Sequence, residues 1–130
     1  MKATELMVGN WVLINGTPRK IQAVDGVDDE IMADDELYTL AEDRYHSEDK
    51  VDGVPITPEI LEKNGFRKLV TYGTEKWLCN NLRLNVYSSD GTWRFCADTN
   101  RNENSVIYIR FVHELQNALS LCGIKHDIKL

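Results

Sequence analysis

The sequence contains no long apolar run. No stretch of its 130 residues approaches the roughly 18 consecutive apolar residues that a helix needs to cross a bilayer. The first residues, Met1 to Glu5, also lack the apolar segment of a signal peptide. These absences argue against a membrane-bound or exported protein, and we expect a cytoplasmic one.

Cysteine and histidine are scarce and show no metal-binding spacing. The chain has three of each, and neither a Cys-x-x-Cys nor a His-x-x-x-His pair occurs. Cys79, Cys96 and Cys122 are an odd number, and each lies among apolar or aromatic neighbours, as a buried thiol does. We therefore expect free thiols in a reducing compartment, no bound metal and no other cofactor.

Catalytic signatures are also missing. The chain has no Gly-x-Ser-x-Gly, paired-histidine or Cys-His motif. His113 is the most tempting single residue, yet a catalytic histidine needs a nucleophile or an orienting acid within reach. We predict a structural polar junction of His113, Gln116 and Asn117 between a strand and the last helix, and a protein that is not an enzyme. An enzyme built around His113 would instead require a solvent-open pocket.

Charge is distributed unevenly along the chain. The net charge is -6, but Asp25 to Lys50 alone carries eleven acidic residues and a local balance of -9, which leaves +3 for the remainder. The pI near 5.0 argues against general affinity for duplex DNA. The acidic tract lacks the register of a calcium-binding EF-hand loop. We interpret it as a solvated face that guards strand edges.

The N-terminal part reads as a small β lobe. Asn15-Gly16 lies between apolar runs, which favours a β-hairpin because both residues tolerate positive φ. Leu6 and Val8 before Gly9, followed by Trp11 to Ile14, predict a strand that bends sharply, as in SH3-like barrels. We assign residues 1–52 to an SH3-like β lobe that includes the acidic tract.

The strongest local signal begins after Pro55, which marks the boundary between lobes. Thr57 can cap a helix whose first residue is Pro58, and Asn64-Gly65 offers a left-handed stop. The sequence therefore predicts a short helix that opens the second part of the chain, residues 53–130.

An antiparallel meander follows this helix. Alternating apolar residues and turn signals predict strands over 66–72, 75–79, 82–88, 92–97 and 106–110. From about Phe111 to Cys122, apolar residues recur at helical spacing, and Gly123 ends the pattern. We predict an α+β fold in which this helix packs on one face of the sheet and both lobes share one core.

Three motifs support a resemblance. Glu5 to Val12 (ELMVGNWV), Pro55 to Leu61 (PITPEIL) with Asn64-Gly65-Phe66, and Val112 to Leu119 (VHELQNAL) occur in this order along most of the chain. In this layout the sequence resembles a family of small Bacteroidetes and phage-encoded proteins. The resemblance implies a phage or mobile-element context and no particular activity, cofactor or partner.

One sheet face combines cations and aromatics. If the strands pair as predicted, the face opposite the helix gathers Lys68, Tyr72, Arg83, Tyr87, Arg94, Tyr108 and Arg110. The leading hypothesis is a non-enzymatic module that contacts a protein partner through its acidic lobe or through this exposed sheet. The alternative is single-stranded nucleic-acid binding on this face, because aromatics stack on bases and cations attract phosphate. An ordinary solvent face is the third interpretation.

Overall fold

The computed structural model describes residues 1, 5–25, 30–33, 45–79, 82–86, 90–97, 106–124 and 127–130; at 25, 45, 48, 82–86 and 97 it describes the backbone alone. Within these residues the chain forms ten strands and two α-helices, and all strand pairs are antiparallel. The predicted α+β class is confirmed. Contacts divide the chain into unit 1, Met1–Val54, and unit 2, Pro55–Leu130.

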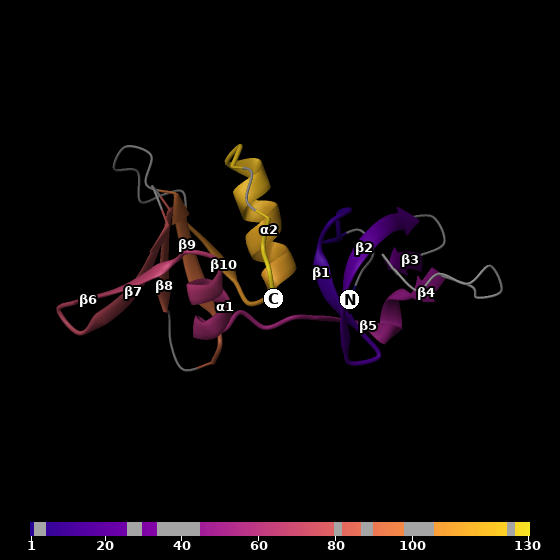
Figure 1. Cartoon of the computed structure of the whole chain (residues 1–130), viewed down its shortest axis with the longest axis horizontal. Helices are drawn as coiled ribbons and strands as arrows, with labels where there is room; N and C mark the ends of the chain where they lie inside the picture. Colours follow the sequence, from indigo (N-terminus) through magenta and orange to yellow (C-terminus); the bar gives the residue numbers. More distant parts are fainter. Residues whose placement is uncertain are drawn as a thin grey trace. The chain divides into compact units, whose positions relative to one another are not determined.

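Unit 1 is a five-stranded sheet. Its strands are β1 (Trp11–Ile14), β2 (Thr17–Asp25), β3 (Glu30–Ala33), β4 (Tyr45–Ser47) and β5 (Val51–Gly53), in the order β4-β3-β2-β1-β5. A turn of 3-10 helix, Glu48–Lys50, leads directly into β5, which returns to pair with β1 (Figure 1). The sheet is open, with β4 and β5 at its edges.

The predicted hairpin is present at Asn15 and Gly16. Their φ angles are 50° and 81°, and Ile14 pairs with Thr17, so the connection is a two-residue turn. Pro18 lies in β2 opposite Leu13.

The chain before β1 differs from the prediction. Val8 lies in a turn with Gly9, whose φ is 91°, and none of the described residues before Trp11 belongs to a strand. The Oδ1 of Asn10 accepts the N–H of Met7 at 2.7 Å, which holds this turn. A local side-chain acceptor thus competes with strand pairing here.

Unit 1 has a hydrophobic core of its own. The inward positions of its strands supply most of the buried residues, and Leu6 adds to them from outside the sheet. These residues are Leu6, Val12, Ile14, Ile21, Ile31, Ala33 and Val51. The expectation that both lobes share one core stays a prediction.

Unit 2 begins with the short helix that the sequence predicts. Helix α1 spans Pro58–Lys63, and the Thr57 hydroxyl oxygen accepts the N–H of Ile60 at 3.3 Å. Gly65 follows with a φ of 85°, and Phe66 donates its N–H to the carbonyl of Leu61. The predicted cap and stop of this helix are both confirmed.

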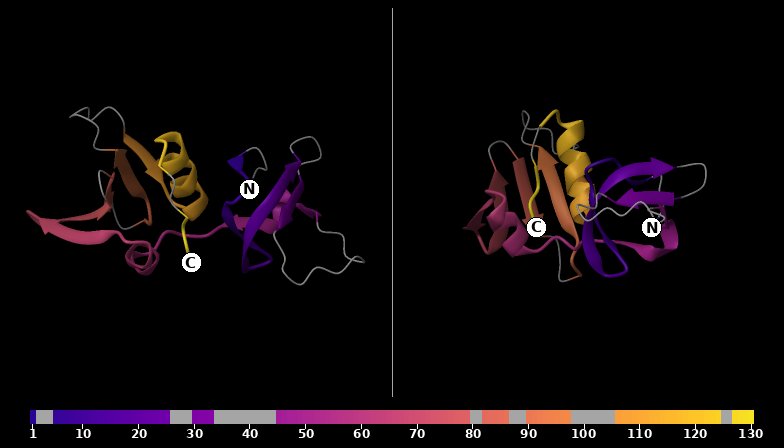
Figure 2. Two further views of the ribbon diagram at one scale, coloured as in Figure 1. Left: turned by 45° about the horizontal axis from the view of Figure 1, so that its top comes forward. Right: turned by 45° about the vertical axis from the view of Figure 1, so that its right-hand side comes forward.

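The second sheet is the predicted meander. Its strands are β6 (Arg67–Thr71), β7 (Thr74–Cys79), β8 (Leu82–Val86), β9 (Trp93–Ala97) and β10 (Val106–Ile109), and sequential neighbours pair in the order β10-β9-β8-β7-β6. Figure 2 shows this sheet from two further directions.

Side chains alternate between two faces of this sheet, and residues paired across an antiparallel ladder share a face. By register, the tryptophan face consists of Lys68, Val70, Glu75, Trp77, Cys79, Leu82, Leu84, Val86, Trp93, Phe95, Ala97, Ile107 and Ile109. The arginine face consists of Arg67, Leu69, Thr71, Thr74, Lys76, Leu78, Arg83, Asn85, Arg94, Cys96, Val106 and Tyr108.

The tryptophan face carries the larger share of the buried sheet residues. Trp77, Trp93, Phe95 and Ile109 are all at most 5% exposed. Figure 1 shows α2 (Val112–Leu121) alongside the sheet near β10. The apolar stripe of this helix is also buried, as an amphipathic helix is when it packs on the apolar face of a sheet.

Helix α2 matches the predicted amphipathic segment with one exception. Val112, Leu115, Ala118 and Leu119 are buried along one stripe. Cys122, which the periodic pattern included in that stripe, is exposed. The reason is that the helix ends at Leu121, so the residue after it is no longer held on the buried side.

The last residues of the chain are held against α1 by Asn64. Its side-chain amide accepts the N–H of Lys129 and donates to the carbonyl of Lys129, each at 2.7 Å, and also donates to the carbonyl of Ile60. Asn64 is 8% exposed and the neighbouring Ile128 is 1% exposed. One amide therefore pairs with both backbone groups of Lys129, as an adjacent strand would.

We expect Asn64→Ala to lower the free energy of unfolding of unit 2 by about 1–3 kcal/mol, because it leaves the N–H and C=O groups of Lys129 without their part-buried hydrogen bonds. Hydrogen exchange at the Lys129 amide should accelerate. Asn64→Asp keeps the acceptor for that amide and should preserve more of its protection. An unchanged Lys129 exchange rate in Asn64→Ala would contradict this role.

Candidate binding face

Cations are the charged residues at the strand positions of the arginine face. One cross-strand row runs Tyr108, Arg94, Asn85, Lys76, Leu69, and the next runs Val106, Cys96, Arg83, Leu78, Arg67. These strand positions include Arg67, Lys76, Arg83 and Arg94 and no acidic residue. A concentrated positive face is unexpected in a chain with a net charge of -6.

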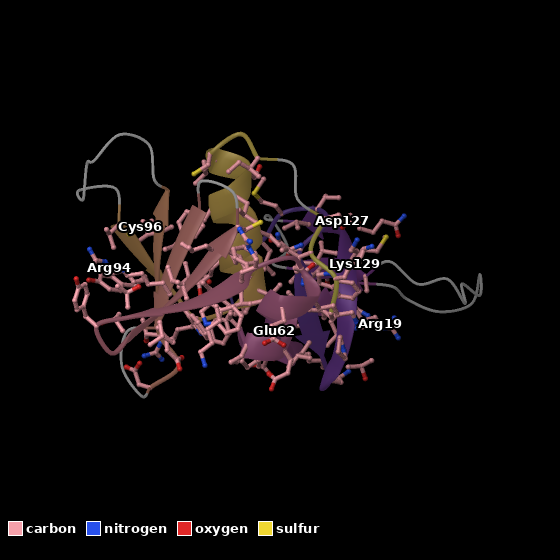
Figure 3. All side chains as sticks on the ribbon, turned by 60° about the vertical axis from the view of Figure 1, so that its left-hand side comes forward. Arg19, Glu62, Arg94, Cys96, Asp127 and Lys129 are labelled. Carbon is pink, nitrogen blue, oxygen red and sulfur yellow. The ribbon has the colours of Figure 1, made fainter. Side chains whose placement is uncertain are left out.

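Arg94 lies near the middle of β9 on this face. Figure 3 shows it on the side of the sheet turned away from α2. Its Nε is buried and has no hydrogen-bond partner among the residues that the structure describes. A buried donor without an acceptor costs about 1–3 kcal/mol, so native proteins seldom retain one without a use. An acceptor from a ligand would satisfy it.

Lys68 does not lie on the face where we expected it. It pairs with Trp77, which places it on the tryptophan face, and its Nζ lies 3.0 Å from a carboxylate oxygen of Glu75. The two-residue turn at Tyr72 and Gly73 sets this register, and a shift of one residue exchanges the faces.

Of the two outer tyrosines of the predicted set, the structure describes Tyr72 alone, and Tyr72 does not add to the face. Tyr72 is fully exposed in the turn with a φ of 51°, outside both strands. Tyr87 lies outside the described residues, and Arg83 is placed on the face by its backbone register alone. Tyr108 pairs with Arg94 and is 54% exposed.

Arg110 lies just beyond β10. Its Nε donates to the Thr92 hydroxyl at 3.1 Å, and a terminal nitrogen lies 3.7 Å from a carboxylate oxygen of Asp90. These contacts join the end of β10 to the segment before β9. Of the predicted set, the structure therefore brings Arg94 and Tyr108 together, with Arg83 on a neighbouring strand.

The polar junction before α2 is closed by a residue that we did not predict. One carboxylate oxygen of Glu114 accepts the N–H groups of Arg110 at 3.0 Å and Phe111 at 3.1 Å. The sequence carries a signal for this contact, because Glu114 stands three residues after the N-cap position, where a capping box has its glutamate. Gln116 and Asn117 are half-buried further along α2.

His113 is buried in the first turn of α2. It is 3% exposed, and its ring stacks on that of Phe111 at 5.8 Å between centroids, with 11° between the planes. A histidine enclosed in this way cannot receive a substrate from solvent without local opening. The burial argues against an enzyme built around this residue.

The acidic tract falls largely outside the described residues. The residues outside the described part include Asp28, Asp29, Asp34, Asp35 and Glu36. That they guard strand edges stays a prediction. At the end of the tract, the hydroxyl of Ser47 donates to the carboxylate of Asp49, and this bond is the main cause that lowers the pKa of Asp49.

The remaining chemistry-bearing groups are dispersed. No group of three His, Cys, Asp or Glu side chains could hold a metal ion within the described part of the chain. Cys79 is half-buried and Cys96 buried, and both are free thiols. No described helix combines the length and apolar character that a membrane span requires.

No protein-family model, curated protein or solved structure that we compared with the chain matches it. The resemblance to Bacteroidetes and phage-encoded proteins stays a prediction that depends on the three sequence motifs.

The burial of His113 predicts low chemical reactivity. We expect diethyl pyrocarbonate to modify the half-exposed His46 in the folded protein much faster than His113, because the reagent must reach a ring nitrogen. Mass spectrometry of digested protein measures both rates. Equal rates would show that His113 is open to solvent, and denatured protein provides the control in which both should react.

Proposed function

We propose that the protein is a non-enzymatic interaction module that binds an acidic protein partner on its arginine face. The observation that carries the proposal is Arg94, whose buried Nε has no acceptor among the side chains that the structure describes, on a face whose strand positions include no acidic residue. A carboxylate is the natural occupant, because a guanidinium binds it through two parallel hydrogen bonds.

The position of Arg94 suits such contact. Lys76 lies in the same cross-strand row, and Arg67 and Arg83 lie in the next row. Neighbouring strands are about 4.8 Å apart, so several carboxylates on one partner surface could meet several cations together. The half-exposed ring of Tyr108 beside Arg94 adds contact area.

A protein partner is better supported than single-stranded nucleic acid. Nucleic-acid grooves stack successive bases on several aromatic side chains. Of the three tyrosines in the predicted set, Tyr108 is the one placed on this face by the described structure.

Unit 1 supports a related proposal about fold. The strand order β4-β3-β2-β1-β5 and the 3-10 turn before β5 are features expected of an SH3-like lobe. Such lobes commonly act as adaptors, so this kinship would suit a binding protein, although a fold alone does not determine function. The phage or mobile-element context remains part of the same proposal.

The test uses the full chain with two defined polyanions, polyglutamate and oligothymidylate, titrated at low salt. We expect polyglutamate to bind and Arg94→Gln to weaken it about tenfold, since a charge-assisted hydrogen bond contributes about 1.5–3 kcal/mol. Lys50→Gln removes the same charge from unit 1 and should bind like the unchanged protein.

Two results would overturn the proposal: no binding of polyglutamate by the unchanged protein, or equal binding by Arg94→Gln and Lys50→Gln. The nucleic-acid alternative would replace it if oligothymidylate binds more tightly than polyglutamate and if each of the variants Arg94→Gln and Tyr108→Ala loses this binding.

A further inference from the structure

Strand β6 forms one edge of the second sheet, and its backbone groups are turned outward at defined positions. The two-residue turn makes Thr71 and Thr74 a hydrogen-bonded pair, and bonded and non-bonded pairs alternate along an antiparallel ladder. Leu69 therefore bonds to β7, while Lys68 and Val70 direct their N–H and C=O groups away from the sheet.

The edge is regular and partly apolar. The register from Arg67 to Thr71 is continuous, without a bulge or a proline. Leu69 is 47% exposed on the arginine face, and Val70 is 59% exposed on the tryptophan face. Proteins usually protect such edges with bulges, prolines or charges.

Charge protects this edge only in part. Arg67 and Lys68 occupy the first half of β6, but Lys68 is ion-paired with Glu75 inside its own hairpin. The opposite edge of the sheet differs, because Pro55 bridges to Phe111 and the N–H of Ile56 bonds to the carbonyl of Arg110 just beyond β10. Within the described part of unit 2, β6 and β10 are the two terminal strands of the sheet, and the contacts of Pro55 and Ile56 lie just beyond β10.

We propose that an extended acidic peptide segment adds as an antiparallel strand to β6. This inference rests on the proposed function and specifies how the partner binds. The backbone of the segment pairs with Lys68 and Val70. Its acidic side chains lie on the arginine face near Arg67 and Lys76, and its aliphatic side chains lie beside Val70 on the tryptophan face.

Charge complementarity favours this occupant over a second copy of the chain. Two β6 strands paired about Leu69 would place Arg67 and Lys76 of both copies on one continuous face. Like charges brought together in this way oppose association. An acidic segment neutralises the same cations and completes the same backbone hydrogen bonds.

The probe is a peptide of alternating glutamate and valine, mixed with the full chain labelled for NMR. We expect at least about tenfold slower hydrogen exchange at the amides of Lys68 and Val70, as each gains a hydrogen bond, and little change at Leu69, which is already bonded to β7. Val70→Pro removes an outward N–H without touching the β7 ladder and should weaken binding about tenfold or more while the fold persists.

Two N-methylated peptides separate strand addition from simple charge attraction. In antiparallel pairing the valines stand opposite Lys68 and Val70, so methylation of the valine nitrogens should abolish binding. Methylation of the glutamate nitrogens leaves the charge of the peptide and its N–H groups that face β6 intact, and should preserve binding. Equal binding of both peptides overturns strand addition while leaving an acidic partner in place. Strand addition is also overturned if the alternating peptide does not bind although polyglutamate does. A stable dimer through β6 would overturn it as well. If polyglutamate does not bind, the proposed function itself is overturned.

Discussion

Alternation of side chains across the second sheet separates an apolar core surface from a cationic one. Each strand contributes to both, because successive residues point to opposite faces. Trp93 and Phe95 are buried on one side, and Arg94 between them lies on the other. A slip of one residue in β9 would turn the guanidinium into the apolar core and expose both rings, at a cost of several kcal/mol. The core therefore fixes the position of the candidate site.

The elements of the fold follow from local signals in the sequence. Thr57, Pro58 and Gly65 bound α1 because capping, fixed φ and positive φ act within a few residues. The Asn15-Gly16 turn and the alternating strands are local in the same sense. At Val8 and Gly9 the prediction failed because the side chain of Asn10 accepts a backbone N–H and stabilises a turn in place of a strand.

Features that depend on register or on contacts distant in sequence were harder to predict. Lys68 appeared to share a face with Arg94, but that inference required the exact pairing of β6 with β7, which the Tyr72-Gly73 turn decides. Asn64 was predicted to end a helix, and its bonds to Lys129 join residues 65 positions apart. No periodic pattern carries such information. Glu114 could have been predicted, since its spacing from the N-cap is a local signal.

The division of the sheet into two faces is tested most directly by alanine substitution at three consecutive positions of β9. Trp93→Ala and Phe95→Ala should each lower the free energy of unfolding by about 3–5 kcal/mol, and Arg94→Ala by less than about 1 kcal/mol. Urea denaturation of the three variants gives the values. A loss at Arg94 equal to that at Phe95, or a loss below about 1 kcal/mol at Phe95, would contradict the assignment of faces from which the binding proposals are derived.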